Sequence, residues 1–431
     1  MTVRTPRLRA VAVALCATAA VVLAEPARAA PTIQYGVQDD AWLNHGPGSL
    51  ESRVGELRRL GVDVVRFTVR WDQVTRRQPR HPRDHRDSAY DWTGPDRVLQ
   101  ALRREGIAPV VTLFGTPPWA NDGRAANFAP TSQASFANFA RAAATRYSWV
   151  KLWTIWNEPN QAIWLRPTSA RTYVEKLLNP AYAQIHAVVA AAQVGGGVTA
   201  ARGGSAGVPP VPWIRAMGAA QARLDAYAHH PYPSRPQSET PWGPACPHCS
   251  TLTMADLERL QSEVRRAFGP KRIWLTEYGY QTNPPDLFLG VTPATQAQHV
   301  ASASRRVYAA PNVDLLVFFL VRDDASSEGW QSGIVAADGR KKPAYTAFRL
   351  PLTQVARRGT SVSLWGQVRA REGPQPFRLR RYEAGRWSWV GGTRSTDGGG
   401  FFSLTVTAPR GSLLQIWSPR DGIFSLAVRV T

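Results

Sequence analysis

Residues 150–160, VKLWTIWNEPN, contain the pattern that decides the fold. A mainly apolar run from Val150 to Trp156 is followed directly by Asn157 and Glu158. An apolar run of this length, closed by a proline, is typical of a strand that is buried on both faces. The pattern therefore predicts a buried parallel strand with an amide and a carboxyl group at its C-terminal end.

Residues 272–281, RIWLTEYGYQ, repeat this design and place Glu277 at the end of a second apolar run. Two such carboxyl groups are the minimum equipment for cleaving a glycosidic bond. Burial favours the protonated form of a carboxyl group and suits it to donate a proton near neutral pH. Either Glu by itself is explained more simply as a salt-bridged strand end. The pair in these two contexts predicts glycosidase chemistry.

Strand-like and helix-like segments alternate from residue 33 to about residue 348. The expected strands are residues 33–40, 62–71, 107–115, 150–160, 193–200, 223–233, 272–281 and 313–324, of which the Gly-rich fifth is the weakest. The expected helices are residues 49–61, 93–106, 135–147, 169–192, 212–220, 254–269, 293–310 and 343–349. Eight such units predict a (β/α)₈ TIM barrel over residues 30–350. An open doubly wound sheet is the alternative, but it would not explain polar residues at every strand end, and the sequence has no GxGxxG motif or P-loop.

The pattern changes after residue 350. Residues 351–431 contain short segments of alternating polar and apolar residues with Gly-rich turns between them. This pattern predicts a small all-β Ig-like sandwich as an accessory domain. The domain is either a structural appendage or a carbohydrate-binding module. Its tryptophans are candidates for stacking on sugars or for the sandwich core: Trp365, Trp387, Trp389 and Trp417.

Residues 1–29 have the pattern of a secretory signal peptide. Basic residues precede an apolar run over residues 11–24, and Ala27 and Ala29 form a small-residue cleavage site. That run is too short to span a bilayer comfortably, and no later apolar run is long enough for a membrane helix. We therefore expect a secreted, extracellular protein with no membrane span.

Two cysteines, Cys246 and Cys249, lie close together after the signal segment, in PACPHC. A pair of cysteines in an exported protein favours a disulfide. The alternatives are a zinc site with His248, which would need two more ligands from elsewhere, and two free thiols.

The formal net charge is +21, and the arginines that dominate it are scattered along the chain. A basic genome-wide composition with a solvated surface explains this simply. Attraction to an anionic extracellular surface, such as an acidic polysaccharide, is the sharper alternative. Nucleic-acid binding is not expected, because the sequence contains no recognised module and no basic run.

Three motifs at strand ends carry a resemblance to a known family: WNEP (residues 156–159), HHPYP (residues 229–233) and TEYG (residues 276–279). Together they resemble clan A of the glycoside hydrolases, the cellulase-like retaining glycosidases with a TIM barrel. The resemblance covers roughly residues 33–349. It implies a polysaccharide or oligosaccharide substrate, with no cofactor and no metal.

The resemblance also implies roles for particular residues. Glu158 would be the acid/base and Glu277 the nucleophile, while Asn157 would hydrogen-bond the sugar 2-hydroxyl. Three further residues match the supporting positions of the clan, two of which would orient Glu277: Arg66, Tyr232 and His230. Trp119 and Trp330, with Trp164, are candidates for sugar platforms, although each is equally explained by packing.

Some positions depart from the cellulase pattern. Many cellulase-like members have His where Phe114 stands, and Trp at the end of the eighth strand, where residues 319–321 read FLV. Residues 116–120 (TPPWA) and 338–349 (DGRKKPAYTAFR) look closer to the xylosidase- and arabinosidase-like relatives.

Two other classes of function remain. One is a non-catalytic glycan-binding or cell-envelope adhesion protein on a glycosidase-like barrel, which would have no use for both carboxylates. The other is a metal-dependent hydrolase, for which the sequence has no convincing ligand cluster.

Overall fold

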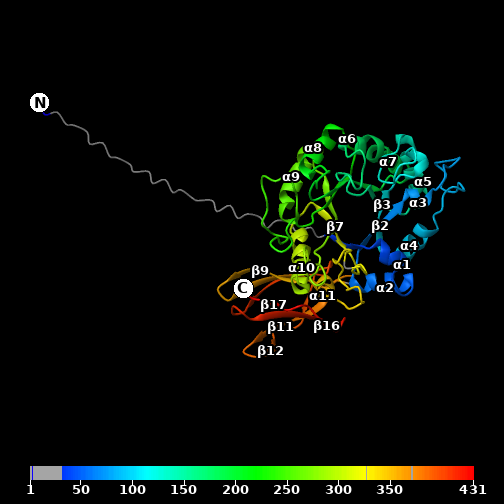
Figure 1. The fold of residues 1–431 in the computed structure, drawn as a ribbon. Helices are drawn as coiled ribbons and strands as arrows, with labels where there is room; N and C mark the ends of the chain where they lie inside the picture. Colours follow the sequence, from blue (N-terminus) through cyan, green and yellow to red (C-terminus); the bar gives the residue numbers. More distant parts are fainter. Residues whose placement is uncertain (1, 3–31, 327, 370–371) are drawn as a thin grey trace.

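The structure is a computed structural model that describes residues 2, 32–326, 328–369 and 372–431 (Figure 1). The predicted signal peptide lies outside the described residues, except for residue 2. No helix in the described part of the chain combines the length and the apolar character needed to cross a membrane.

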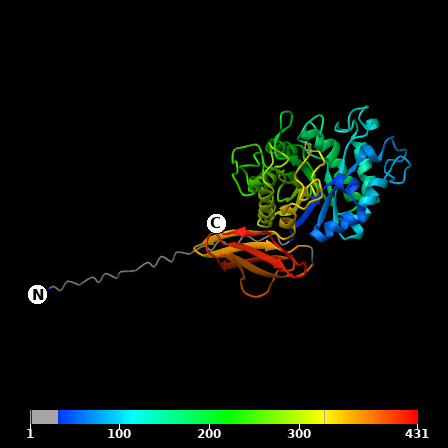
Figure 2. The same cartoon turned by 60° about the horizontal axis from the view of Figure 1, so that its bottom comes forward.

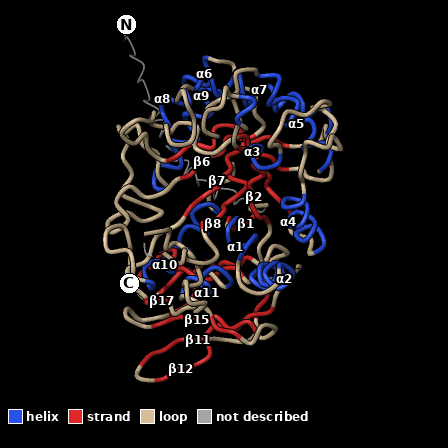
Figure 3. The backbone as a smooth tube through the Cα atoms, turned by 45° about the vertical axis from the view of Figure 1, so that its right-hand side comes forward, coloured by secondary structure: helices blue, strands red, loops and turns tan. Residues whose placement is uncertain are grey.

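Eight parallel strands form a closed barrel in chain order, seen as the central group of strands in Figure 3. They are β1 (Gln34–Gln38), β2 (Val64–Arg70), β3 (Ala108–Phe114), β4 (Leu152–Ile155), β5 (Gln193–Ala200), β6 (Ala226–His230), β7 (Arg272–Tyr278) and β8 (Val313–Phe319). The barrel closes because β1 pairs with β8 along its whole length. The predicted (β/α)₈ barrel is therefore confirmed.

Helices surround this barrel (Figure 1). They are α1 (Asp40–His45), α2 (Leu50–Leu60), α3 (Trp71–Val74), α4 (Thr93–Arg104), η1 (Pro118–Ala120), α5 (Gln133–Arg146), α6 (Ala170–Tyr173), η2 (Val174–Leu178), α7 (Asn179–Val188), α8 (Pro210–Ala219), η3 (Met254–Asp256), α9 (Leu257–Phe268), α10 (Pro293–Tyr308) and α11 (Pro343–Arg349). The helix predicted over residues 169–192 is interrupted by the π-helical turn η2. Helix α2 is capped as its sequence predicts: the Ser49 hydroxyl accepts a hydrogen bond from the Ser52 N–H, and Gly61 closes the helix at φ 76°.

Strand β5, the weakest in the sequence, is a complete strand whose glycines lie against large side chains. A Cβ atom on Gly195 would lie 2.7 Å from the Trp274 ring, and one on Gly197 would lie 2.5 Å from the Tyr227 ring. Gly197 also has a φ of 91°. The glycines are therefore the residues that the neighbouring strands require at these places.

The interior of the barrel changes from apolar to polar towards the C-terminal ends of the strands. Its apolar part consists of residues from six strands: Val64, Val110, Val198, Ala226, Ala228, Trp274, Leu315 and Val317. Arg66 of β2 and Thr112 of β3 lie two residues after Val64 and Val110 and are also buried inside the barrel. Arg66 Nε donates a hydrogen bond to Thr112 Oγ1 at 3.0 Å. Thr112 is in turn bonded to Thr154 of β4, with 2.7 Å between the hydroxyl oxygens.

The C-terminal part consists of two antiparallel sheets (Figure 2). The three-stranded sheet contains β14 (Phe401–Thr407), β10 (Ser361–Gln367) and β9 (Leu352–Arg358). The second sheet contains β12 (Arg386–Trp389), β11 (Pro376–Glu383), β15 (Leu413–Ser418) and β16 (Ile423–Phe424), with β13 (Arg394–Ser395) paired to β11 and β17 (Val428–Arg429) paired to β15. Both sheets contribute buried apolar residues to one core, in which Phe377 stacks on Phe402. An all-β part therefore follows the barrel, as predicted.

The three-stranded sheet packs against the barrel. Trp365 and Phe401 lie against Tyr308 of α10, with ring centroids 5.3 and 4.6 Å from that ring. The buried Arg369 guanidinium lies 3.8 Å from the centre of the Tyr35 ring. Tyr35 lies near the start of β1, so the sheets cover the end of the barrel where the strands begin. Trp365 therefore belongs to this interface and is not a surface platform for sugars.

Trp274 tests the importance of the apolar interior. We expect Trp274→Ala to lower the free energy of unfolding by about 3–5 kcal/mol, because the cavity that it leaves is walled by other strands. Trp242, which is 42% exposed, is the matched control, and Trp242→Ala should have a much smaller effect. Unfolding in guanidinium chloride, followed by circular dichroism, measures both. Similar losses for the two variants would contradict the role given to Trp274.

Candidate active site

A cavity of about 690 Å³ lies at the C-terminal ends of the barrel strands. Side chains that follow β4 and β6 or lie near the end of β7 line it, among them Asn157, Glu158, Tyr232 and Glu277. This is the end of a (β/α)₈ barrel at which the side chains of different strands converge. Gln38, Asn157 and Glu277, which accept hydrogen bonds from the buried Arg66, are among the lining residues.

Glu277 of β7 is held by a cation and a hydroxyl group. The Arg66 guanidinium, fully buried inside the barrel, donates a hydrogen bond to Glu277 Oε1. The Tyr232 hydroxyl donates to Glu277 Oε2 at 3.1 Å. Burial and the nearby Glu277 carboxylate raise the pKa of Tyr232 well above its usual value, which keeps the phenol protonated as a donor. The two contacts together fix the orientation of the Glu277 carboxylate, because each of its oxygens accepts a hydrogen bond.

Arg66 links four other residues of the barrel. Besides Glu277, its guanidinium donates to Gln38 Oε1, to Thr112 Oγ1 at 3.0 Å and to Asn157 Oδ1 at 2.8 Å. These partners come from β1, β3 and the segment after β4. The bond from Arg66 fixes the Asn157 amide with its oxygen towards the guanidinium. The Asn157 NH₂ group is therefore the part left to donate to a ligand.

The segment that follows β4 and contains Glu158 has a backbone conformation that residues other than glycine rarely adopt. Trp156 has a φ of 71° and Glu158 a φ of 37°, both in the left-handed region. Two hydrogen bonds hold Trp156: its N–H donates to Leu113 O at 2.8 Å, and its indole N–H donates to Trp164 O at 2.7 Å. Backbone strain of this kind persists where the surrounding structure fixes it, and it is frequent at functional sites.

Burial raises the pKa of Glu158 to about 7, although Arg66 opposes the shift. The hydrogen bonds and ion pairs of the described residues give Glu158 no cationic partner comparable to the one that Arg66 provides for Glu277. Two carboxyl groups in one cavity therefore have different environments. Such a difference is what an acid and a nucleophile require of two glutamates.

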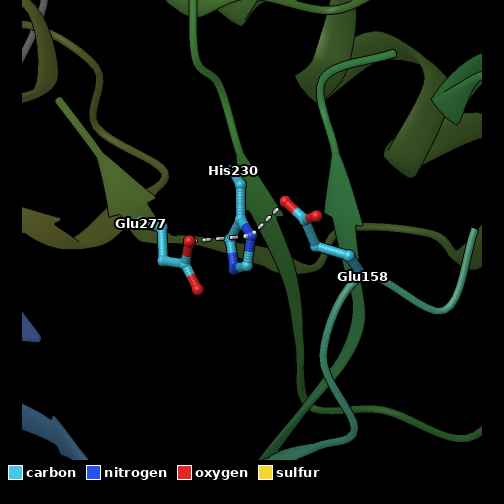
Figure 4. Close-up of side chains that lie close together, drawn as sticks. All are labelled: Glu158, His230 and Glu277. Carbon is cyan, nitrogen blue, oxygen red and sulfur yellow. Dashed lines mark hydrogen bonds and ion pairs between the residues drawn. The ribbon is translucent and has the colours of Figure 1, made fainter. Parts of the chain in front are cut away.

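His230 lies between the two carboxylates (Figure 4). Its Nδ1 is 2.9 Å from Glu158 Oε1 and 3.6 Å from Glu277 Oε2. Burial lowers the pKa of His230 to about 3, so the ring is neutral and Nδ1–H is the donor to the carboxylates. The neighbouring His229 has another function: its Nδ1 lies 2.8 Å from Thr199 Oγ1 and its Nε2 lies 2.8 Å from Leu252 O, away from the carboxylates.

The structure brings Glu158, His230 and Glu277 together, with one ligand-type atom of each within 4.8 Å of the others. Carboxyl groups of retaining glycosidases lie about 5–5.5 Å apart, and those of inverting enzymes about 6.5–9.5 Å apart. The 4.8 Å limit on the distance between one oxygen of each glutamate is nearer to the retaining range than to the inverting one. The same three residues offer ligand atoms for a metal ion, but the guanidinium on Glu277 already supplies the positive charge there. The cluster is therefore better suited to proton transfer than to a divalent cation.

Of the three predicted platforms, Trp164 and Trp330 line the cavity and Trp119 does not. Trp330 lines the cavity, is 46% exposed and packs edge-on against Phe319, with the ring centroids 5.7 Å apart. Trp119 is not among the lining residues: its indole N–H donates to Thr75 O, and its ring packs edge-on against Trp71. The indole ring and the N–H donor of Trp119 are therefore both used in contacts within the protein, as the packing alternative for this residue expects.

Several lining residues were not picked out from the sequence, among them Gln38 and Asp40. Gln38 accepts a hydrogen bond from Arg66, and Asp40 begins α1 directly after the first strand. The signal that identified Glu158, polar residues just after an apolar run, is also present in residues 33–40. It would have found Gln38 and Asp40.

Cys246 and Cys249 form a disulfide in the loop after β6. The Cys246 N–H donates to Asp256 Oδ1 at 2.7 Å, and Arg259 donates to Cys246 O at 2.8 Å. With both sulfur atoms joined to each other, neither is a thiolate ligand for zinc.

No protein-family model and no curated protein matches the sequence. Solved structures share the fold. A family 39 glycoside hydrolase from Bacteroides cellulosilyticus is 17% identical with a TM-score of 0.57, and the match covers 91% of this chain and 81% of that one. CelM2, a bifunctional glucanase-xylanase from a metagenome library, is 12% identical with a TM-score of 0.51, covering 94% of this chain and 97% of that one.

β-Glucuronidase 2 from Bacteroides uniformis is 11% identical with a TM-score of 0.50, covering 93% of this chain and 46% of that one. The chain thus spans about half the length of the glucuronidase. At these identities the likeness to all three structures is one of fold.

The pairing of Arg66 with Glu277 is testable by a double-mutant cycle. Arg66→Met leaves a buried carboxylate without its cation, and we expect it to destabilise the protein by about 3 kcal/mol or more. In a Glu277→Gln background the same change should cost clearly less, because no charge remains to be paired. Urea unfolding of the four proteins at pH 7 measures the coupling. Strictly additive losses would show that the two groups do not stabilise each other.

Proposed function

We propose that the protein is a secreted, retaining β-glycosidase that hydrolyses O-glycosidic bonds of a polysaccharide or oligosaccharide by double displacement. One observation carries the proposal: carboxylate oxygens of Glu158 and Glu277 lie within 4.8 Å of each other in a cavity at the mouth of the barrel. The clan A resemblance of the strand-end motifs and the glycosidase names of structures with this fold support it. The two carboxyl groups supply the chemistry, so the proposal includes no cofactor.

In the first step, Glu277 attacks the anomeric carbon of the bound sugar. The bond from this carbon to the glycosidic oxygen breaks as the carboxylate forms an ester bond to the sugar. Glu158, protonated at the start, gives its proton to the departing oxygen. The Arg66 guanidinium and the Tyr232 hydroxyl hold the Glu277 carboxylate in position for the attack.

In the second step, a water molecule attacks the same carbon. Glu158, now a carboxylate, takes a proton from the water, and the ester bond to Glu277 breaks. The sugar leaves with the configuration it had in the substrate, and both glutamates return to their starting states. His230 lies beside Glu158 in both states and, being neutral, does not compete for the proton.

Asn157 is positioned to bind the sugar 2-hydroxyl. Its amide oxygen is occupied by Arg66, which leaves its NH₂ group for the substrate. Hydrogen bonds at the 2-hydroxyl strengthen as the oxocarbenium-like transition state develops. This contact thus links the substrate to the same guanidinium that holds the nucleophile.

The rim of the cavity is wide and partly apolar, which favours a chain of sugars over a single small one. Ile163, Leu289 and Trp330 line the cavity and are 70%, 41% and 46% exposed. Inside, Phe114 packs against Trp156 and Trp164 and gives an apolar wall where many cellulases have a histidine. This wall favours a substrate other than cellulose. Export is supported by the pattern of residues 1–29 and by the disulfide.

The nucleophile is tested by Glu277→Ala. We expect turnover of aryl glycosides to fall at least about a thousandfold, and azide to restore part of it by attacking in place of the missing carboxylate. Glu263→Ala is the matched control, because Glu263 is also buried and ion-paired with arginine but lies on α9, outside the cavity lining. Product stereochemistry, followed by NMR, should show retention for the wild type and inversion for the azide product.

Three results would count against the proposal. Near-normal activity of Glu277→Ala would show that Glu277 is not the nucleophile. Tight binding of glycans with no cleavage across a panel of aryl glycosides and defined oligosaccharides would favour a non-catalytic binding protein. Loss of activity on treatment with a chelator would favour a metal-dependent hydrolase.

The pH profile tests Glu158. Because the first step needs protonated Glu158, and burial raises its pKa to about 7, kcat/KM should fall as the pH rises through about 7. Glu158→Gln cannot ionise, so the alkaline limb should disappear for a substrate whose leaving group needs no proton, such as a dinitrophenyl glycoside. An unchanged alkaline limb in this variant would assign the titration to another group.

A further inference from the structure

The second C-terminal sheet has one face in the core and one outer face. Along β11 the side chains alternate: Phe377 and Leu379 are buried in the core shared by the two sheets, and Arg378 and Arg380 project from the other side. The three-stranded sheet packs against the barrel, so the sheet containing β11 and β12 is the layer away from it (Figure 1).

Aromatic side chains cover this outer face. Residues paired directly across neighbouring strands point to the same side of a sheet. By this pairing five aromatic residues lie on the same side as Arg378 and Arg380: Tyr382, Trp387, Trp389, Trp417 and Phe424. We call these seven residues the aromatic–arginine face. Their rings form two groups, with centroids 5.4 Å apart for Tyr382 and Trp387 and 5.9 Å apart for Trp389 and Trp417. The Arg380 guanidinium joins the groups, because it lies over both Trp387 and Phe424.

Much of this aromatic surface is open to solvent. Tyr382 and Trp387 are each 37% exposed, and Trp389 is 43% exposed. Leaving such large rings in water is unfavourable, and exposed aromatic patches of this kind mark interaction sites. The four residues of β12 are all exposed, at the edge of the sheet.

The two arginines lie among these rings as uncompensated cations. Arg380 lies 3.5 Å from the centre of the Phe424 ring and 4.3 Å from that of Trp387, and Arg378 lies 4.0 Å from that of Trp389. Arg380 donates to the neutral Gln415 amide. In the part of the chain that the structure describes, neither guanidinium has a carboxylate within ion-pair distance. Both arginines therefore keep donors for an anion, held in place by the rings.

We propose that the aromatic–arginine face binds an acidic polysaccharide whose sugars carry carboxylate groups. The pyranose rings would lie on the exposed indoles, and the carboxylates would accept hydrogen bonds from Arg378 and Arg380. Charge complementarity selects this partner, because the face is cationic and the whole chain has a formal net charge of +21. The choice of a glycan over a single-stranded nucleic acid, which also uses stacking and arginine, rests on the proposed function.

The face is far from the catalytic cavity. The sheets cover the end of the barrel where the strands begin, whereas Glu158 and Glu277 lie at the other end. The face is thus an anchoring site on a polymer or matrix and not an extension of the catalytic cleft.

The full-length protein carrying Glu277→Gln, which would not degrade its ligand, is titrated with polygalacturonate, alginate and hyaluronan at 150 mM salt. Each polymer is paired with its carboxyl-reduced, neutral form. We expect at least one acidic polymer to bind at least about tenfold more tightly than its neutral form. Trp387→Ala/Trp389→Ala and Arg378→Gln/Arg380→Gln should each weaken this binding by a similar factor.

Two control variants separate the face from general effects. Trp242→Ala removes another exposed indole that also lies under two arginines, and Arg76→Gln/Arg80→Gln removes two exposed positive charges elsewhere. Both should bind like the parent. Circular dichroism shows that all variants are folded, and Trp387→Ala/Trp389→Ala in the wild-type background should hydrolyse small aryl glycosides at the normal rate.

The proposal is overturned if no acidic polymer binds, if the Arg76→Gln/Arg80→Gln control loses as much affinity as the face variants, or if single-stranded DNA binds the same face more tightly than any glycan. Its failure is distinct from that of the proposed function. If binding depends on Trp387 and Trp389 but the protein cleaves no glycoside, the proposed glycosidase function is wrong and the proposed binding by the aromatic–arginine face stands.

Discussion

A buried guanidinium holds the site together. Arg66 is fully buried inside the barrel, and a charge in this position is tolerated only if its donors are satisfied. Its partners come from β1, β3, β7 and the segment after β4. Only a closed barrel brings those strands around one point, since β7 and β2 are far apart in an open sheet of the same order. The fold and the site therefore depend on each other through one side chain.

The same arrangement explains how two glutamates in one cavity differ. Glu277 has a cation and a phenol as donors, whereas Glu158 has a neutral imidazole. Burial then dominates at Glu158 and raises its pKa. The difference lies in the surroundings, because both residues are glutamates at strand ends. Burial keeps the imidazole of His230 neutral, so this ring adds no positive charge between Glu158 and Glu277.

The sequence predicted the barrel because eight apolar runs with polar ends are a strong and repeated signal. The same reasoning located Glu158, Glu277, Asn157, His230 and Tyr232, since strand ends converge in this fold. Their roles in catalysis, the signal peptide and the substrate stay predictions. What the sequence hid depends on contacts between distant segments.

Three examples show the limit. The glycines of β5 look like weak strand residues until Trp274 and Tyr227 are seen to fill the space beside them. Trp119 was a candidate platform because the local sequence does not show its contacts. Its ring packs against Trp71, and its indole N–H donates to the Thr75 carbonyl. The left-handed backbone at Trp156 and Glu158 is imposed by bonds to Leu113 and Trp164, and no feature of the residues themselves announces it. The two faces of the C-terminal part differ: Trp365, Arg369 and Phe401 pack against the barrel, while the ring and cation contacts of the aromatic–arginine face among the described residues stay within its own sheet. The solvent-facing residues of β11, β12 and β15 can therefore be exchanged for those of a lectin-like module, which would direct the protein to a chosen material and leave the cavity at the other end of the barrel unchanged.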